Sequence, residues 1–144
     1  VMLQTTNGIM NASLYDRITT HTLLSWQRVR VANLLANGGR DWSAICADDE
    51  ATYSNQYMVI DYKKFTPGQA LQEDTLWVTE QIPGFWEAAD LTQTLERGYW
   101  ASYNVPFFRT LYEKSGYKLA SEHVRGQASV EGGDIAATTA LTGM

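Results

Sequence analysis

The sequence predicts an α+β fold in which helices pack on a sheet that is mixed or mostly antiparallel. Residues 54–62 carry large apolar side chains on both faces of a strand pattern, as in a strand covered from both sides. Residues 75–82 and 85–89 read as two further strands, separated by Pro83-Gly84. Apolar residues also recur at helical spacing between residues 23 and 35. Strands and helices therefore share one domain.

The chain opens on a predicted strand over residues 1–6. Asn7-Gly8 follows, a dipeptide typical of tight turns, and Ile9 begins a possible return strand. The first two strands could thus form a hairpin.

A helix is predicted from Thr20 or Thr22, either of which could cap it, to about Asn37. Its apolar stripe is expected to face the core, with Arg28 off that stripe. The stripe consists of Leu23, Leu24, Val31, Leu34 and Leu35. Gly38-Gly39 would supply a left-handed stop, and Asp41 would cap a second, short helix that ends at Cys46.

The second half predicts two more helices and a tail. Asp90 would cap a helix over residues 91–97, and Pro106 suits the first turn of a helix that runs to Gly116. No aromatic residue follows Tyr117, and the chain becomes rich in Gly, Ala and Thr from Gly126. We therefore expect a domain over residues 1–117 and a divergent or flexible tail over residues 118–144.

Composition excludes several classes of function. The net charge of −5 disfavours a nucleic-acid binder, which needs a basic face to neutralise phosphates. No stretch of the sequence approaches the length of a membrane span. A single cysteine, Cys46, allows no intrachain disulfide, and His21 and His123 stand far apart in sequence. We expect no metal site and no cofactor.

No nucleophile is evident in the sequence. Cys46 sits among small apolar residues and is followed by Asp48 and Asp49, which would raise a thiol pKa, so we interpret it as a packing residue. His21 and His123 lack a serine or cysteine motif beside them. They read as ordinary surface or capping residues.

Carboxylates give a second set of candidates. They are Asp61, Glu80 and Glu87. A carboxylate flanked by large apolar residues must be paired or shift its pKa. Lys63, Arg28 or Arg30 could supply a structural partner, and a glycosidase-like acid/base pair is the alternative.

Two asparagines stand out. Asn55 opens a strand, where a rigidly held amide could donate to a developing oxyanion, although a bond to its own backbone is the simpler interpretation. Asn11-Ala12-Ser13 is a sequon for N-glycosylation.

Five segments, in the same order and at the same spacing, resemble the phospholipase B-like (lamina ancestor) family. They are Ser13-Leu14-Tyr15-Asp16, residues 30–36, residues 52–63, Glu80-Gln81-Ile82-Pro83-Gly84 and residues 99–106. The resemblance covers residues 1–117 and is that of a C-terminal-side fragment. Thr5 and Thr6 match a threonine pair of the family, to which we assign no role.

The resemblance implies part of an N-terminal-nucleophile hydrolase, a four-layer αββα sandwich. It implies a lysosomal or secreted glycoprotein, with a signal peptide outside this chain and a glycan at Asn11. The implied activity is hydrolysis of acyl ester or amide bonds, with phospholipids as substrates. The nucleophile would be an N-terminal cysteine freed by self-cleavage, whose α-amino group serves as base.

Carried onto this chain, the resemblance places Asn55 where such enzymes hold an oxyanion-hole amide. The cysteine nucleophile would lie in the N-terminal part of the same protein, and Cys46 does not take its place. The fragment alone is then expected to be inactive. A non-catalytic lysosomal module of the same fold, binding lipid or glycan, is the alternative.

Overall fold

A computed structural model describes residues 1–47 and 52–130 of the 144-residue chain. Five α-helices, two 3₁₀ helices and four strands lie within those ranges. In chain order they are β1 Met2–Thr6, η1 Ala12–Arg17, α1 Ser25–Leu35, α2 Gly39–Ala47, β2 Asn55–Ile60, η2 Tyr62–Lys64, β3 Leu76–Ile82, β4 Phe85–Asp90, α3 Thr92–Leu95, α4 Arg109–Lys114 and α5 Tyr117–Val130.

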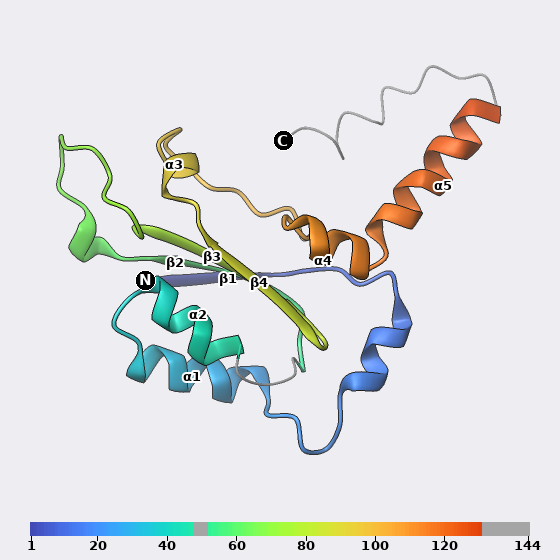
Figure 1. The fold of residues 1–144 in the computed structure, drawn as a ribbon, viewed down its shortest axis with the longest axis horizontal. Helices are drawn as coiled ribbons and strands as arrows, with labels where there is room; N and C mark the ends of the chain where they lie inside the picture. The colour runs from blue at the N-terminus through green and yellow to red at the C-terminus, as the bar shows by residue number, and fades with distance from the viewer. Residues whose placement is uncertain (48–51, 131–144) are drawn as a thin grey trace.

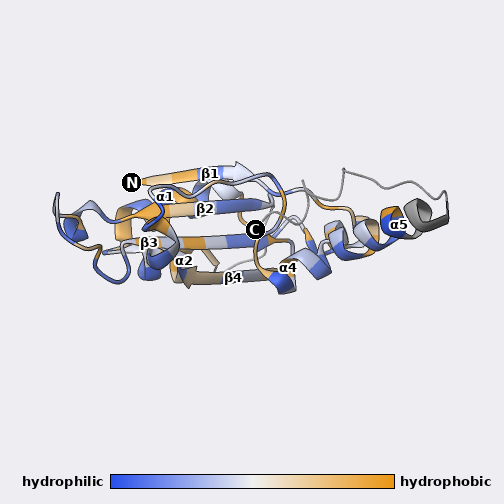
Figure 2. Cartoon of the chain, turned by 90° about the horizontal axis from the view of Figure 1, so that it is seen from above, coloured by the Kyte–Doolittle hydropathy of each residue, from blue (hydrophilic) through white to orange (hydrophobic). Residues whose placement is uncertain are grey.

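The four strands form one antiparallel sheet in the order β1-β2-β3-β4 (Figures 1 and 2). The prediction of an α+β fold with an antiparallel sheet is confirmed. The strands predicted at 54–62, 75–82 and 85–89 appear as β2, β3 and β4, and β3 and β4 meet across Pro83-Gly84. Gly84 takes the left-handed conformation, φ 79°, that such a turn needs.

The hairpin predicted for residues 1–10 is wrong. β1 pairs instead with β2, which lies far away in sequence, and Thr6 stands opposite Asn55. After Thr6 the chain leaves the sheet, because the Asn7 amide N–H binds the Ser54 carbonyl at 3.0 Å and the Gly8 N–H binds the Asn104 carbonyl at 2.9 Å. These two bonds direct the chain toward η1.

Apolar layers cover both faces of the central strands. On one face Tyr57 and Val59 of β2 pack under α1 and α2, against Ala32, Trp42 and Cys46. On the other face the buried core residues are Met58, Leu76, Val78 and Phe108, with partly buried residues of the 91–107 segment around them. Figure 1 shows α1 and α2 on one side of the sheet and α3 and α4 on the other. The doubly covered strand that the sequence predicts is therefore confirmed for β2.

Helix α1 is turned the opposite way from the prediction. Its buried residues are Arg28 and Ala32, whereas the predicted core stripe is exposed. The small Ala32 lets the helix lie close to the sheet, and the neighbouring helix fills the remaining space with Trp42. Neither predicted cap holds: the helix begins at Ser25, and the Thr22 hydroxyl accepts from the Thr19 N–H at 3.0 Å, outside the helix.

Gly38-Gly39 does not supply a left-handed stop. Gly39 instead opens α2, and neither glycine has a positive φ. A side chain at Gly39 would collide with Trp77, since a Cβ there would lie 2.6 Å from the Trp77 Cβ. Glycine is thus required for close packing rather than for a turn. Asp41 accepts from the Asn37 N–H at 3.2 Å, which ties it to the α1–α2 connection and not to a helix cap.

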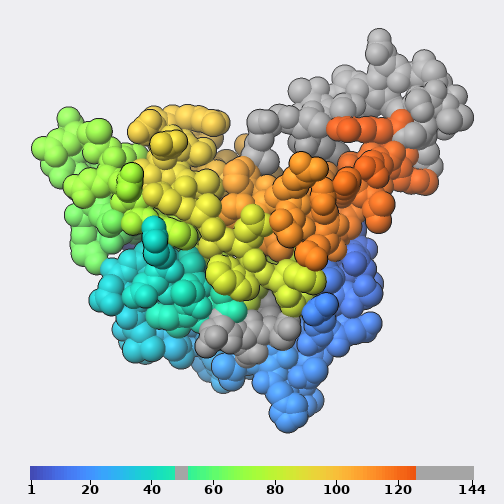
Figure 3. All heavy atoms as spheres, in the orientation of Figure 1, coloured from blue at the N-terminus to red at the C-terminus, as the bar shows by residue number. Residues whose placement is uncertain are grey.

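The C-terminal helices are shorter or longer than predicted. The helix expected over 91–97 is the single turn α3, beside which Asp90 accepts from the Thr92 N–H at 2.9 Å. The helix expected from Pro106 begins at Arg109. Residues 118–130, which composition assigns to a tail, continue α5, and this helix projects from the body (Figures 1 and 3). Residues 131–144 lie outside the described residues, and the domain boundary at 117 stays a prediction.

The fully buried carboxylate of Glu80 ties four segments together on the face opposite α1. Its oxygens accept from Asn7 Nδ2 at 3.0 Å and from Gln56 Nε2 at 2.7 Å. They also accept from the N–H groups of Phe107 and Phe108, each at 2.8 Å. The sequence correctly predicted a partnered carboxylate, but the partners are amides rather than the cations that we expected. Four donors replace the water that a buried carboxylate loses.

Replacing Glu80 is expected to destabilise the fold. In Glu80→Gln an NH₂ group would face N–H donors, so we expect the free energy of unfolding to fall by about 1–3 kcal/mol. Denaturant titration of the full-length protein measures the change. Glu87→Gln is the matched control, because Glu87 stands opposite Glu80 in the sheet but is only partly buried. Equal losses in both variants would contradict the special role of Glu80.

The cost of Glu80→Gln should also depend on pH. Burial raises the pKa of Glu80, against the bonds from Phe107 and Phe108 that lower it. A pKa raised in the folded state gives stability that is complete below the unfolded value, about 4.3, and is lost as pH rises through the folded value. The advantage of wild type over the variant should therefore be larger near pH 4 than at pH 7. An advantage that grows with pH would contradict this prediction.

Candidate functional site

A cleft of about 750 Å³ lies between β1 and α1. Its walls combine apolar and polar side chains, with the cationic Arg30 among the polar ones. They are Met2, Leu3, Gln4, Ser25, Trp26, Val29, Arg30, Asn33, Tyr53 and Asn55. A concave site that combines apolar surface with polar groups is the usual form of a small-molecule site. The cleft also contains the predicted site residue Asn55, which makes it the candidate functional site.

Asn55 lies at the start of β2, on the sheet face that α1 and α2 cover. It is buried, and the end of β1 with Thr5 and Thr6 lies directly beside it. In the amide orientation that satisfies both ends, Oδ1 accepts from the Tyr57 hydroxyl at 3.0 Å. Nδ2 then donates to the carbonyl oxygens of Thr5 and Ser54, each at 3.2 Å. The amide is rigidly held, and both of its hydrogens are engaged.

A chain of hydroxyl groups extends from Asn55 into the protein. The Tyr57 hydroxyl also shares a hydrogen bond with the Ser25 side chain, and burial raises the pKa of Tyr57. Ser25 Oγ lies 3.1 Å from Thr52 Oγ1 and accepts from Arg28 Nη2 at 3.2 Å. Since each hydroxyl can accept from one neighbour and donate to the next, this chain fixes the direction of the Asn55 amide.

Arg28 is a cation with only 4% of its surface exposed. Its Nη1 donates to the Cys46 carbonyl and, at 2.7 Å, to Gln81 Oε1. Within residues 1–47 and 52–130, its Nε has no hydrogen-bond partner and no carboxylate forms an ion pair with it. A buried guanidinium is costly unless its donors are satisfied, so the three bonds to oxygen atoms hold α1, α2 and β3 at fixed separations.

Cys46 is a core residue, as the sequence predicts. It is buried in the layer beneath α1 and α2. Burial raises the pKa of the thiol to about 11, although the Arg28 charge and a hydrogen bond with Tyr57 lower it. A thiol with such a pKa is protonated near neutral pH and is a poor nucleophile.

The predicted carboxylates do not form a catalytic pair. Glu80 is committed to its four donors, and Asp61 forms an ion pair with Lys63 at 3.6 Å, as the structural interpretation predicted. Neither carboxylate lines the cleft beside Asn55. An acid/base pair of the glycosidase kind therefore has no support in the geometry.

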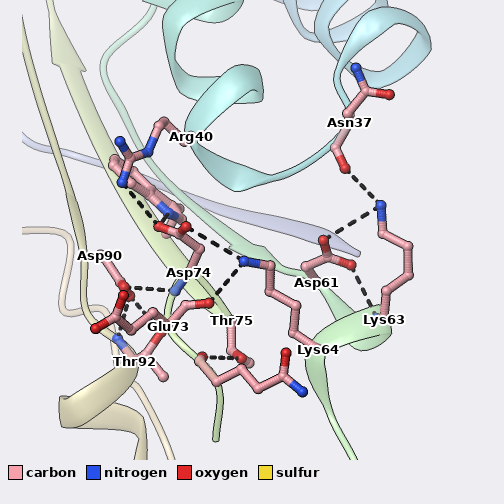
Figure 4. Close-up of polar contacts among 12 residues, drawn as sticks. Asn37, Arg40, Asp61, Lys63, Lys64, Glu73, Asp74, Thr75, Asp90 and Thr92 are labelled. Atoms are coloured by element: carbon pink, nitrogen blue, oxygen red, sulfur yellow. Dashed lines mark hydrogen bonds and ion pairs between the residues drawn. The ribbon is translucent and has the colours of Figure 1, made fainter.

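A cluster of charged residues occupies the opposite end of the sheet (Figure 4). Asp74 pairs with Arg40 at 3.4 Å and with Lys64 at 3.5 Å, and accepts from Trp77 Nε1 at 2.8 Å. The bond from Trp77 first, and then the two cations, hold the pKa of Asp74 below its ordinary value. Each cation of the cluster has a carboxylate partner, so the cluster joins α2, η2 and β3 rather than binding an anion.

The two histidines are exposed in the structure. Among the described residues, no group of three or more His, Cys, Asp or Glu side chains could hold a metal ion. None of the helices in that part of the chain combines the length and the apolar character needed to cross a bilayer.

Asn11 is exposed at the N-terminus of η1. Its Oδ1 accepts from the Ser13 N–H at 3.3 Å and from the Ser13 hydroxyl at 2.8 Å. Asn11 Nδ2, the nitrogen to which a glycan would be attached, donates to the Lys114 carbonyl in a long bond of 3.4 Å. The sequon is therefore on the surface, where an oligosaccharide could be attached without displacing the core.

Three residues around Asn55 were not predicted from the sequence. Tyr57 could have been found, because it lies two residues away on the same strand face. Arg28 and Ser25 come from a helix whose buried side depends on tertiary packing, so no local signal indicates them.

The fold and the cleft define an α+β domain with a buried amide, Asn55, beside a cleft of mixed apolar and polar lining. Residues 1–127 match the sequence profile described as Phospholipase B. The chain is 48% identical over 118 residues to Phospholipase B-like protein B of Dictyostelium discoideum and 48% identical over 120 residues to Phospholipase B-like 1 of Rattus norvegicus. It is 42% identical over 118 residues to Phospholipase B of Crotalus adamanteus. These alignments cover 81%, 83% and 81% of this chain and 21%, 22% and 21% of those proteins.

The chain belongs to the Phospholipase B family, which confirms the resemblance found in the sequence. The matched part extends beyond the predicted boundary at 117, to residue 127. The chain spans about a fifth of the length of the curated relatives that it matches.

Cys46 is expected to resist alkylation in the folded protein. With a pKa of about 11, only about one thiol in a thousand is ionised at pH 8, and the side chain is also buried. Iodoacetamide should therefore modify Cys46 at least about 100-fold more slowly in the folded protein than in guanidinium. Mass spectrometry of the peptide that contains Cys46 measures both rates. Equal rates would show that the thiol is accessible and reactive.

Proposed function

We propose that this chain is a segment of an acyl hydrolase of the Phospholipase B family and supplies the oxyanion-stabilising amide, Asn55. Membership of the family supports a hydrolase, since relatives such as the Crotalus protein are named as phospholipases. The observation that carries the assignment to Asn55 is its position at the cleft, with its amide orientation fixed by Tyr57. The bond cleaved is an acyl ester or an amide, with phospholipids as the proposed substrates.

In this proposal the nucleophile is a cysteine in the N-terminal part of the same protein. The fold of the whole is an N-terminal-nucleophile αββα sandwich, to which this chain contributes one antiparallel sheet and its helices. Cys46 is unsuited to the role of nucleophile because its thiol is buried and protonated. The isolated chain is therefore expected to have no turnover.

The chemistry follows from these roles. The α-amino group of the cysteine takes the thiol proton while the sulfur forms a bond to the acyl carbon, and the carbonyl electron pair moves onto oxygen. The oxyanion takes one hydrogen bond from Asn55 Nδ2, in place of the 3.2 Å bond to the Thr5 or Ser54 carbonyl. Collapse of the intermediate expels the alcohol or amine, which receives a proton from the α-amino group. Water then cleaves the thioester and releases the carboxylic acid.

A non-catalytic module that binds lipid or glycan is the second candidate. The apolar walls of the cleft, with Trp26 and Val29, would suit a lipid tail without any chemistry. The two candidates differ in one observation, because only the enzyme needs a cysteine that becomes N-terminal. Both candidates share a proposed location, a lysosome or the secreted fraction, and the proposed glycan at Asn11 goes with that location.

Asn55→Ala should lower kcat without lowering substrate affinity. Removal of one oxyanion donor costs about 10²–10³ in kcat, because the bond is strongest in the transition state. Hydrolysis of a short-chain phospholipid or an amide substrate by the full-length protein measures the change, and thermal unfolding shows whether the variant is folded.

A matched control for Asn55→Ala is Asn33→Ala. Asn33 lines the same cleft, but its amide oxygen accepts from Trp42 Nε1 at 2.7 Å and takes no part in the contacts around Asn55. If Asn55→Ala retains wild-type kcat in a folded protein, the oxyanion role is wrong. Turnover by the isolated chain that Cys46→Ala abolishes would refute the proposal of an external nucleophile.

Asn11 is expected to carry an N-linked glycan in protein secreted from a eukaryotic cell. Its exposed side chain and surface position allow the transfer. Treatment with an amidase that removes N-glycans should increase electrophoretic mobility, and Asn11→Gln and Ser13→Ala should each abolish the part of the shift that belongs to this site. Unmodified Asn11 in the peptide map of secreted protein would rule out this use of the sequon.

A further inference from the structure

Arg28 brings a positive charge into the interior without a carboxylate to neutralise it. The side chain is buried, and no ion pair among the described residues includes it. Its bonds go instead to uncharged oxygen atoms of Cys46, Gln81 and Ser25. A guanidinium does not lose its proton in a protein, so the charge is retained there. The layer between α1 and the sheet therefore has a positive potential that these neutral oxygens do not cancel.

The charge of Arg28 acts on groups beside the candidate site. Burial raises the pKa of the Tyr57 hydroxyl and of the Cys46 thiol, and the Arg28 charge is among the influences that lower both values. The Tyr57 ring is fixed in place, because it packs against Trp42 with 5.0 Å between the ring centroids. Arg28 therefore interacts electrostatically with the immobile hydroxyl group that holds the Asn55 amide.

The hydrogen bonds between Arg28 and the cleft all point in one direction. A guanidinium can only donate, so Ser25 Oγ accepts from Arg28 Nη2 at 3.2 Å and keeps its own hydrogen for the Tyr57 hydroxyl. The Tyr57 hydroxyl in turn donates to Asn55 Oδ1 at 3.0 Å. Each donor is polarised by the one before it, and Asn55 Nδ2 is the last donor of the series. A cation at the start of this series makes the amide at its end a stronger donor.

We propose that Arg28 is a positioning residue for the hydrolysis, and that its charge strengthens Asn55 as an oxyanion donor through the two hydroxyl groups between them. This role rests on the proposed function of Asn55, and Arg28 itself does not line the cleft. Negative charge develops on the substrate oxygen only in the transition state, so the positive potential should raise kcat rather than substrate affinity. A unit charge a few hydrogen bonds away, at an effective dielectric constant of about 20, changes a rate by roughly tenfold.

A pair of serine variants of the full-length protein tests the series of hydrogen bonds. Ser25→Ala should lower kcat for a short-chain phospholipid by roughly fivefold at unchanged KM, since it interrupts the series but leaves the charge in place. Ser43→Ala is the matched control: Ser43 is a buried serine of α2, and its hydroxyl donates to the Gly39 carbonyl at 2.8 Å, outside the series. Equal kcat values in both variants, or a change in KM alone, would overturn the proposal.

Two replacements of Arg28 separate its charge from its hydrogen bonds. Arg28→Gln and Arg28→Lys both lose the planar fork of donors, but only lysine keeps a positive charge. Arg28→Gln should lower kcat by roughly tenfold at unchanged KM, and Arg28→Lys should recover at least about a third of the wild-type value. Thermal unfolding shows which variants are folded. Equal kcat values in the two folded variants would show that the charge has no role, and if either variant does not fold, the serine variants decide.

A double variant shows whether the effect passes through the Asn55 amide. In Asn55→Ala protein, Ser25→Ala should lower kcat by less than about twofold, because the donor that it would weaken is already gone. Fully additive losses would overturn the proposal. If Asn55→Ala alone retains wild-type kcat, the proposed function fails and the role of Arg28 fails with it. If Asn55→Ala loses activity while Ser25→Ala and Arg28→Gln retain it, only the role of Arg28 is refuted.

Discussion

The buried carboxylate of Glu80 is the constraint on which the arrangement of the sheet depends. It joins residues that are distant in sequence: Asn7 after β1, Gln56 in β2, and the backbone before α4. Each donor satisfies part of one desolvated charge, so the four segments can be placed in only one way without leaving that charge unpaired. Through Asn7 and Gln56 this residue supports the pairing of β1 with β2, and through the N–H groups of Phe107 and Phe108 it holds the segment before α4 against the sheet.

The polar groups on the two faces of the sheet have different roles. On the Glu80 side the polar groups bond mainly to one another and support the fold, although the buried Asn7 Oδ1 has no hydrogen-bond partner among the described residues. On the α1 side the polar groups run from Arg28 through Ser25 and Tyr57 to Asn55, and end at a cleft. Since side chains alternate along β2, Gln56 points to the Glu80 face, and its neighbour Asn55 points to the α1 face. One strand thus links the structural centre to the candidate site.

Much of the fold could be predicted because its signals are local. The strands around Met58, Val78 and Phe85 show in their apolar patterns and in the turn at Pro83-Gly84. The errors occurred where partners are distant. Asn7-Gly8 resembles a hairpin turn, but the pairing of β1 is decided by β2 and by Asn104. Arg28 looks solvent-exposed on a helical wheel, yet it is buried because oxygen atoms of α2 and β3 accept its hydrogen bonds.

The same reasoning applies to the site. Asn55 could be singled out from its position on a strand and from the family pattern, and the structure places it at a cleft. Its bond to Tyr57 follows from strand alternation, but the bonds that occupy its amide hydrogens come from Thr5 and Ser54.

The reversed orientation of α1 has a practical consequence for protein production. The exposed apolar surface of α1 would favour aggregation when the segment is expressed by itself. This surface includes Trp26, Leu34 and Leu35. Polar replacements at these three positions, which leave Arg28 and Ala32 untouched, offer a route to a well-behaved sample of the domain for solution spectroscopy.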